Sequence, residues 1–112
     1  MTDEQRATLD EFERTVNMTA AELERWLATD PSRSVGQKAA TGGESTGHRS
    51  GRHVVDLLRT HQADYTDDDF AEMRRIVGYA HRHLAQRPAG DVSETAWRYS
   101  LMNWGHDPLE TG

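Results

Sequence analysis

The longest strongly patterned segment of the chain is TDDDFAEMRRIVGYAHRHLAQ, residues 66–86. Its apolar residues recur every three or four positions, as on one buried helix face: Phe70, Met73, Ile76, Val77, Ala80 and Leu84. Thr66 suits an N-cap, and Asp69 three residues later completes a variant of the capping box. Pro88 disfavours helical geometry at the residue before it. The segment therefore predicts one long helix over about 67–86.

Four shorter segments carry weaker helical patterns. They span residues 3–16, 17–29, 51–62 and 93–104. Ser50 and Ser93 are the expected N-caps of the last two. The stretch from 31 to 50 is rich in Gly, Ser and Thr, which indicates a long loop. No strand-like alternation and no repeat is present. We predict an all-α fold, a compact bundle of four to five helices around the long central helix. It forms a single domain over 1–112, with a flexible loop at 31–49.

The composition limits the class of protein. The chain has 112 residues, which fits one domain, and 35% of them are hydrophobic. It contains no cysteine, which excludes disulfides, thiolate metal sites and a cysteine nucleophile. The acidic, polar N-terminus lacks the pattern of a secretory signal or transit peptide. No apolar run approaches the roughly 20 residues needed to cross a bilayer. These features predict a cytoplasmic protein without membrane contact.

Charge is segregated in blocks along a chain whose net charge is -6. Residues 31–62 carry five basic and two acidic residues, and residues 73–90 carry four arginines and no acid. Residues 1–30, 63–72 and 91–112 are net acidic. The two basic blocks also hold five of the six histidines. Such blocks favour either a basic contact surface or internal ion pairing.

The Gly/Ser segment GGESTGHRSGR, residues 42–52, is the strongest candidate for a binding site. His48 and Arg49 stand where a P-loop carries Lys and Ser/Thr, and no strand precedes them, so a P-loop is excluded. A helix start beside basic residues can still bind an anion through backbone N–H groups. The predicted anion- or nucleic-acid-binding residues are Arg49, Ser50, Arg52, His53, Arg82, His83 and Arg87.

The arginines of residues 73–90 favour a nucleic-acid contact. Arg75, Gly78 and Arg82 fall along one stripe of the long helix, where the small Gly78 permits close approach. The preceding helix and this one have the spacing of a helix-turn-helix motif. However, the long helix begins with three aspartates, which would repel DNA phosphates at the end that should enter the groove.

The six histidines do not form a recognised metal motif. Helical chelation needs ligands at i and i+4, whereas His81 and His83 are two residues apart. A zinc site would have to be assembled from distant segments, for example from His53, His83 and His106. We therefore predict no metal, no cofactor and no catalytic residue. A small metal-dependent or acid–base enzyme using these three histidines and Asp107 is the second alternative.

Three stretches of the chain resemble a known family. They are VNMTAAELERWL (16–27), the segment from SGRHVVDLLR (50–59) to YTDDDFAEMRRIVGYAHRHLAQRP (65–88), and WRYSLMNWGHDPL (97–109). The chain resembles the domain of unknown function 3140, a small uncharacterised family of bacteria and fungi. The resemblance implies no catalytic residue, and some members are labelled DNA-binding. It also implies that GHRSGRH, RHLAQRP and NWGHDPL are hallmarks of similar proteins. We expect these hallmarks to meet, because each lies at a helix end.

The leading functional prediction is a non-enzymatic binding module for an anionic partner. Nucleic-acid phosphate is the first expected partner, contacted through the basic Gly/Ser segment and the Arg/His end of the long helix. The alternative is a protein-interaction or stress-associated structural module without a nucleic-acid role, in which the basic blocks pair internally. The sequence does not determine the oligomeric state.

Overall fold

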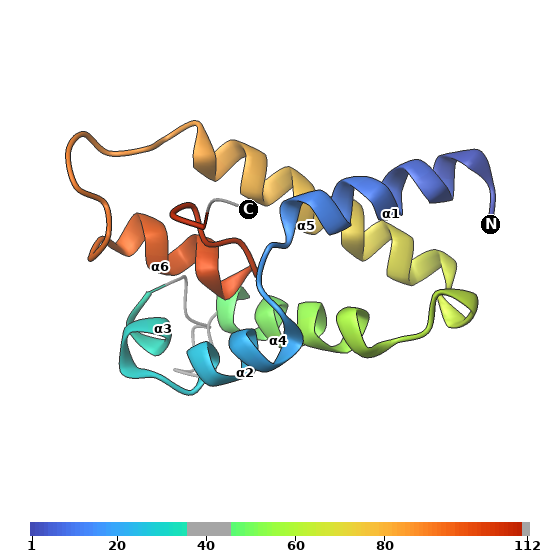
Figure 1. Ribbon diagram of the computed structural model, residues 1–112, viewed down its shortest axis with the longest axis horizontal. Coiled ribbons are helices and arrows are strands. Elements are labelled where there is room, and N and C mark those ends of the chain that lie inside the picture. Colours follow the sequence, from blue (N-terminus) through green and yellow to red (C-terminus); the bar gives the residue numbers. More distant parts are fainter. Residues whose placement is uncertain (36–45, 111–112) are drawn as a thin grey trace.

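Six α-helices and one short 3₁₀ helix form the part of the chain that the computed structural model describes, residues 1–35 and 46–110 (Figure 1). In chain order they are α1 (Asp3–Thr15), α2 (Ala20–Leu27), α3 (Asp30–Ser34), α4 (Thr46–Arg59), η1 (Gln62–Asp64), α5 (Asp67–Leu84) and α6 (Ala96–Asn103). The described residues form no strand, so the predicted all-α fold is confirmed. None of these helices is both long and apolar enough to cross a membrane.

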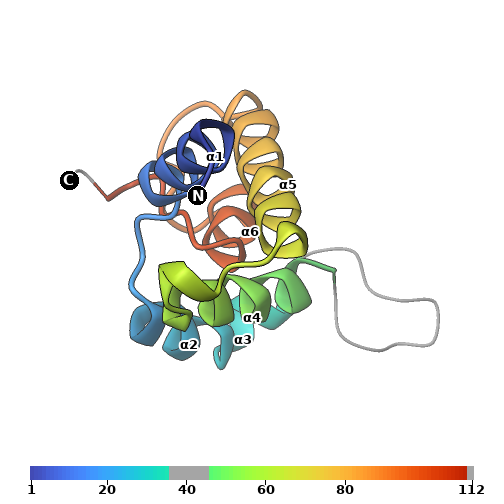
Figure 2. The ribbon, with the colours of Figure 1, turned by 90° about the vertical axis from the view of Figure 1, so that its right-hand side faces the viewer.

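The helices lie in two layers with α6 between them (Figure 2). In one layer α1 packs along α5, and in the other α2 packs along α4. The short α6 contacts α2, α3, α4 and α5. The C-terminal end of α6 therefore lies where the two layers meet, and side chains there can reach both.

The apolar face predicted for the long helix is the core face of α5. Its buried residues are Phe70, Met73, Ile76, Val77 and Ala80. Leu84 is half-buried and packs on a second, smaller cluster that α6 completes with Trp97 and Leu101. The helix begins as predicted, since Thr66 and Asp69 form the capping box through two reciprocal hydrogen bonds of 3.2 and 3.0 Å.

The start predicted for the helix over 51–62 is wrong. This helix, α4, begins at Thr46, so Ser50 is not its N-cap but lies inside it with only 2% of its surface exposed. The reason is tertiary packing. Gly51 has no Cβ, which lets α4 approach the Leu27 side chain and the Asn103 carbonyl closely. This packing outweighs the weak helix propensity of the Gly/Ser composition.

Three further boundaries differ from the prediction. α4 ends at Arg59 and is followed by η1. The last helix is capped by Thr95, whose side chain accepts from the Arg98 N–H, so Ser93 is not its cap. The first residues of the predicted 31–50 loop form α3, because Thr29 provides an N-cap and a proline fits the first helical turn. The middle of that loop, 36–45, lies outside the described residues.

Candidate anion-binding pocket

The seven predicted anion-binding residues lie in different environments on, or just after, two helices. Four lie within α4 and three at or just after the end of α5: Arg49, Ser50, Arg52 and His53, and Arg82, His83 and Arg87. Ser50 is buried towards α5 and accepts a hydrogen bond of 3.0 Å from Arg75. His53 also faces α5, whereas Arg52 lies on the side of α4 that faces α2. The seven residues therefore do not share one surface.

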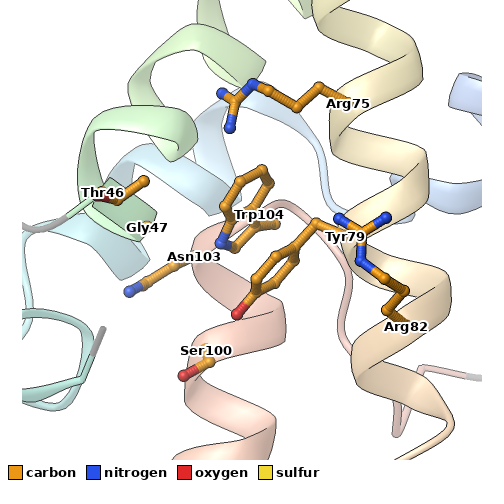
Figure 3. Close-up of a pocket in the computed structure, with 8 residues that line it drawn as sticks. All are labelled: Thr46, Gly47, Arg75, Tyr79, Arg82, Ser100, Asn103 and Trp104. Atoms are coloured by element: carbon orange, nitrogen blue, oxygen red, sulfur yellow. The ribbon is translucent and has the colours of Figure 1, made fainter. Parts of the chain in front are cut away.

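A pocket of about 460 Å³ opens where the start of α4, the middle of α5 and the end of α6 meet (Figure 3). Its lining residues are Thr46, Gly47, Arg75, Tyr79, Arg82, Ser100, Asn103 and Trp104. They supply two guanidinium groups, three hydroxyls, an amide and an indole, but no carboxylate. Such a lining offers hydrogen-bond donors from several directions without a competing anion, so it suits an anionic group.

The pocket unites the three sequence hallmarks. Gly47 comes from GHRSGRH, Arg82 from RHLAQRP, and Asn103 and Trp104 from NWGHDPL. The expectation that these segments meet is confirmed. The helical spacing predicted that Arg75 and Arg82 lie along one stripe of the long helix. Both side chains line this pocket, so their two positive charges face the same cavity.

Arg75 is the rigid member of the arginine pair. Its Nε and Nη2 donate to the Glu72 carboxylate, one turn earlier on α5, and Nη2 also donates to the buried Ser50 hydroxyl. Its guanidinium lies 4.9 Å from the centre of the Trp104 ring. The pKa of Glu72 is lowered mainly by its hydrogen bond with Arg75, so the carboxylate stays ionised. Arg75 is therefore fixed in direction and partly neutralised.

Arg82 is the uncompensated member. Its side chain is exposed, and no carboxylate of residues 1–35 or 46–110 lies within ion-pair distance of it. The guanidinium folds back over α5 and lies above Gly78. A Cβ added at Gly78 would be only 3.1 Å from its Nη1, so glycine leaves room for this conformation. A side chain larger than glycine at position 78 would push Arg82 away. The positive charge of the pocket therefore comes mainly from Arg82.

A column of stacked rings fixes one wall of the pocket. Trp104 stacks on Tyr79 with ring centres 3.9 Å apart, and Tyr79 stacks in turn on His83 at 5.3 Å. Trp97 continues the column at 6.2 Å from His83, and Arg87 lies over its far end at 5.4 Å. His83 and Arg87, two of the predicted phosphate contacts, therefore have a packing role in this column.

Two hydrogen bonds tie His83 to α6, one through its ring and one through its backbone carbonyl. Its Nε2 lies 3.2 Å from the Trp97 carbonyl, and the Trp97 indole donates to the His83 carbonyl at 2.7 Å. Burial lowers the pKa of His83 below its usual value, and the hydrogen bond to the Trp97 carbonyl opposes this only in part. His83 is therefore a mainly neutral packing residue near pH 7.

The free energy of unfolding is expected to fall as the pH drops below about 6.5, the ordinary histidine pKa. Because the folded pKa of His83 is lowered, the unfolded chain takes up a proton at this site first, and acid favours unfolding. Urea denaturation at a series of pH values measures the effect. The variant His83→Gln should lose this part of the pH dependence, and His61→Gln, at an exposed site, should keep it. Equal pH dependence in both variants would contradict the assignment.

The histidines named for a metal or acid–base site have separate partners. His53 Nδ1 lies 3.3 Å from a Glu72 oxygen, and His106 Nδ1 lies 2.7 Å from the Thr15 carbonyl. His83 belongs to the ring column. Within the described parts of the chain, no group of three His, Asp or Glu side chains could hold a metal ion.

Sequence reasoning gave no individual role to Tyr79, Ser100, Asn103 or Trp104 in the lining of the pocket. Asn103 and Trp104 were named only as part of the NWGHDPL hallmark, and Tyr79 and Ser100 were not named. One signal was available for Tyr79, since Tyr79 and His83 are four residues apart and must share a helix face. The approach of Trp104 to both depends on how α6 lies between the two layers, which no local pattern specifies.

Comparison with known proteins places the chain in a family. No curated protein and no solved structure matches the chain. One family model, described as a protein of unknown function (DUF3140), matches residues 11–102. The match spans all of α2 to α5 and most of α6, and thus all of the pocket except its last two residues. The chain belongs to the DUF3140 family of proteins of unknown function.

Proposed function

We propose that the protein is a non-enzymatic binding module whose pocket holds an anionic group of its partner. The observation that carries this proposal is the lining of the pocket, two guanidinium groups and several further donors without a carboxylate. Charge-assisted hydrogen bonds from arginine to phosphate or carboxylate oxygens are short and about twice as strong as neutral ones. Arg75 would act as the preoriented donor and Arg82 as the mobile one that closes on the anion.

The arginines of the basic blocks divide between the two functional alternatives. Arg59 forms two hydrogen bonds of 2.8 Å with Glu24, and Arg75 pairs with Glu72, which supports internal pairing for these two side chains. Arg82 has no such partner among the described residues, which supports a contact with something outside the chain. Since the net charge is -6, attraction of an anion must come from this local cluster and not from the overall field.

Nucleic-acid phosphate is one possible source of the anion, and a small molecule is another. The exposed Arg49 and Arg87 also lack a carboxylate partner in the described ranges, which supports contact with an extended polyanion. The acidic start of α5 would exclude phosphates from the opposite end of that helix. Binding assays with pyrophosphate and with a short oligonucleotide distinguish the two sources.

The variant Arg82→Gln is expected to bind pyrophosphate at least about tenfold more weakly than the wild type, because it loses charge-assisted hydrogen bonds. Isothermal titration calorimetry at low salt measures this, and added salt should weaken the wild-type affinity. The matched control is Arg74→Gln, an exposed arginine of the same helix that does not line the pocket. The proposal fails if wild type does not bind, or if the two variants lose affinity equally.

A further inference from the structure

The indole N–H of Trp104 has no hydrogen-bond acceptor among the described protein residues. The other two tryptophans have theirs satisfied at 2.7 Å, Trp26 by the Asn103 side chain and Trp97 by the His83 carbonyl. For Trp104, whose residue is only 4% exposed, no acceptor for Nε1 is found among the residues that the structure describes. Every fully buried side-chain nitrogen or oxygen in that part of the chain has a partner, so this nitrogen is in contact with solvent. A buried indole N–H normally finds a protein partner. The Trp104 N–H instead stays available to water or to a ligand.

The free N–H of Trp104 opens on the pocket. Its nitrogen faces the start of α4, where a Cβ added to Gly47 would lie 3.4 Å away (Figure 3). Nearby, the hydroxyls of Tyr79 and Ser100 also have no hydrogen-bond partner within the described ranges. The pocket thus has charged donors on α5 and neutral polar groups deeper inside, at the end of α6.

The same geometry disfavours stacking of nucleobases. Trp104 is nearly fully buried between its neighbours, with the Tyr79 ring stacked on it and the Arg75 guanidinium over it. Tyr79 is covered on its other side by His83. Proteins that bind single strands usually offer aromatic faces on which bases stack, and this pocket offers edges and N–H groups instead. Its volume of about 460 Å³ lies within the range of small-molecule sites.

Resting on the proposed function, we infer that the ligand is a small organic anion with two distinct ends. A carboxylate or phosphate group at one end is held by Arg75 and Arg82. An uncharged or second anionic oxygen at the other end accepts the hydrogen bond of Trp104 Nε1–H. Hydroxy acids and sugar phosphates have this chemistry. The phosphates of a nucleic-acid strand would contact the two arginines at the entrance of the pocket. Such a strand would not form a hydrogen bond with the Trp104 indole.

The three indole N–H groups provide a test with internal controls. In ¹⁵N–¹H spectra, citrate and ribose 5-phosphate serve as small probes, and a twelve-residue oligothymidylate serves as the strand probe. The Trp104 indole resonance, assigned with Trp104→Phe, is expected to shift saturably with at least one small probe. The resonances of Trp26 and Trp97 should stay unchanged, because their donors are occupied.

The variant Gly47→Ala separates the deep contact from the charge contact. Its added methyl group would lie against Nε1 at ordinary contact distance, so the fold should be retained while access is blocked. We expect roughly fivefold weaker binding of the small probe, as for one lost hydrogen bond, and a smaller loss for inorganic phosphate, which has a single anionic centre for the arginine end. Arg82→Gln should weaken both.

The outcomes separate the two proposals. If pyrophosphate binds through Arg82 but the Trp104 resonance does not move with either small probe, the inference is overturned and the proposed function stands. If the oligothymidylate shifts the Trp104 resonance and binds more tightly than the small probes, a small-molecule ligand is likewise overturned. If no probe binds, both proposals fail.

Discussion

Replacing Gly51 by alanine is expected to lower the free energy of unfolding by about 3 kcal/mol, because the site has no room for a methyl group. The new Cβ would lie 2.4 Å from the Asn103 carbonyl oxygen and 2.7 Å from the nearest Leu27 methyl carbon. The first is backbone and the second belongs to a side chain that is 5% exposed, so neither can move aside cheaply. Urea denaturation followed by far-ultraviolet circular dichroism measures the loss.

The matched control is Gly78→Ala, the same substitution in the middle of another helix. There the added Cβ would meet only the flexible end of Arg82, at 3.1 Å. Alanine has the better helix propensity by up to about 1 kcal/mol, so this variant should be as stable as the wild type or more stable. Equal destabilisation of the two variants would show that close packing of α4 is not what Gly51 provides.

The second large effect is expected for Asn103→Leu, which should cost about 4 kcal/mol by leaving buried polar groups without partners. Asn103 is fully buried. Its Oδ1 accepts from the Trp26 indole at 2.7 Å and from the Ser32 hydroxyl at 2.6 Å, and its Nδ2 donates to the Ser32 carbonyl at 3.0 Å. These bonds tie α2 and α3 to α6. Leucine fills a similar volume but satisfies none of them.

A matched control for this change is Asn17→Leu. Asn17 also makes two side-chain hydrogen bonds, with the backbone of Asp107 at 3.0 and 2.8 Å, but it is only half-buried. Water can replace its partners, so we expect a smaller loss, about 1 kcal/mol. Thermal unfolding compares the two variants directly. A loss at Asn103 no larger than that at Asn17 would contradict the role assigned to Asn103.

The position of Asn103 links stability to the pocket. The same residue that joins α2, α3 and α6 also lines the pocket, next to Trp104. Its amide is held by Ser32 and Trp26, so this part of the lining is preorganised by bonds that reach across the molecule. A ligand therefore meets a wall whose geometry is already fixed, which reduces the ordering cost of binding.

Much of the fold could be predicted because it depends on interactions within one or two helical turns. The periodic apolar residues of α5 and its cap at Thr66 act over three or four positions, so the pattern located this helix closely. The start of α4 at Thr46 could not be recognised from the sequence in the same way. Its Gly and Ser residues have weak helix propensity, and only contact with Leu27 and α6 makes the helical conformation favourable there.

The candidate site was predicted less well than the fold, for the same physical reason. The stripe of Arg75 and Arg82 follows from helical spacing and was found from the sequence. Which of the two arginines keeps its positive charge available for a ligand depends on the side chains that surround each of them. Arg75 has Glu72 three residues earlier and Ser50 from α4 as partners. The positions three and four residues before Arg82 hold Tyr79 and Gly78, neither of which carries a carboxylate.

By itself, the sequence determined the all-α class, the long helix α5 and its alignment of two arginines, because these follow from local spacing and capping. The tertiary structure alone decided that Gly47, Arg82 and Trp104 line one pocket. These residues belong to segments far apart in the chain, and they meet only because α6 packs between the two helical layers. The free indole N–H of Trp104 is a consequence of that packing, since hydrogen-bond partners across the molecule are not encoded in any local pattern.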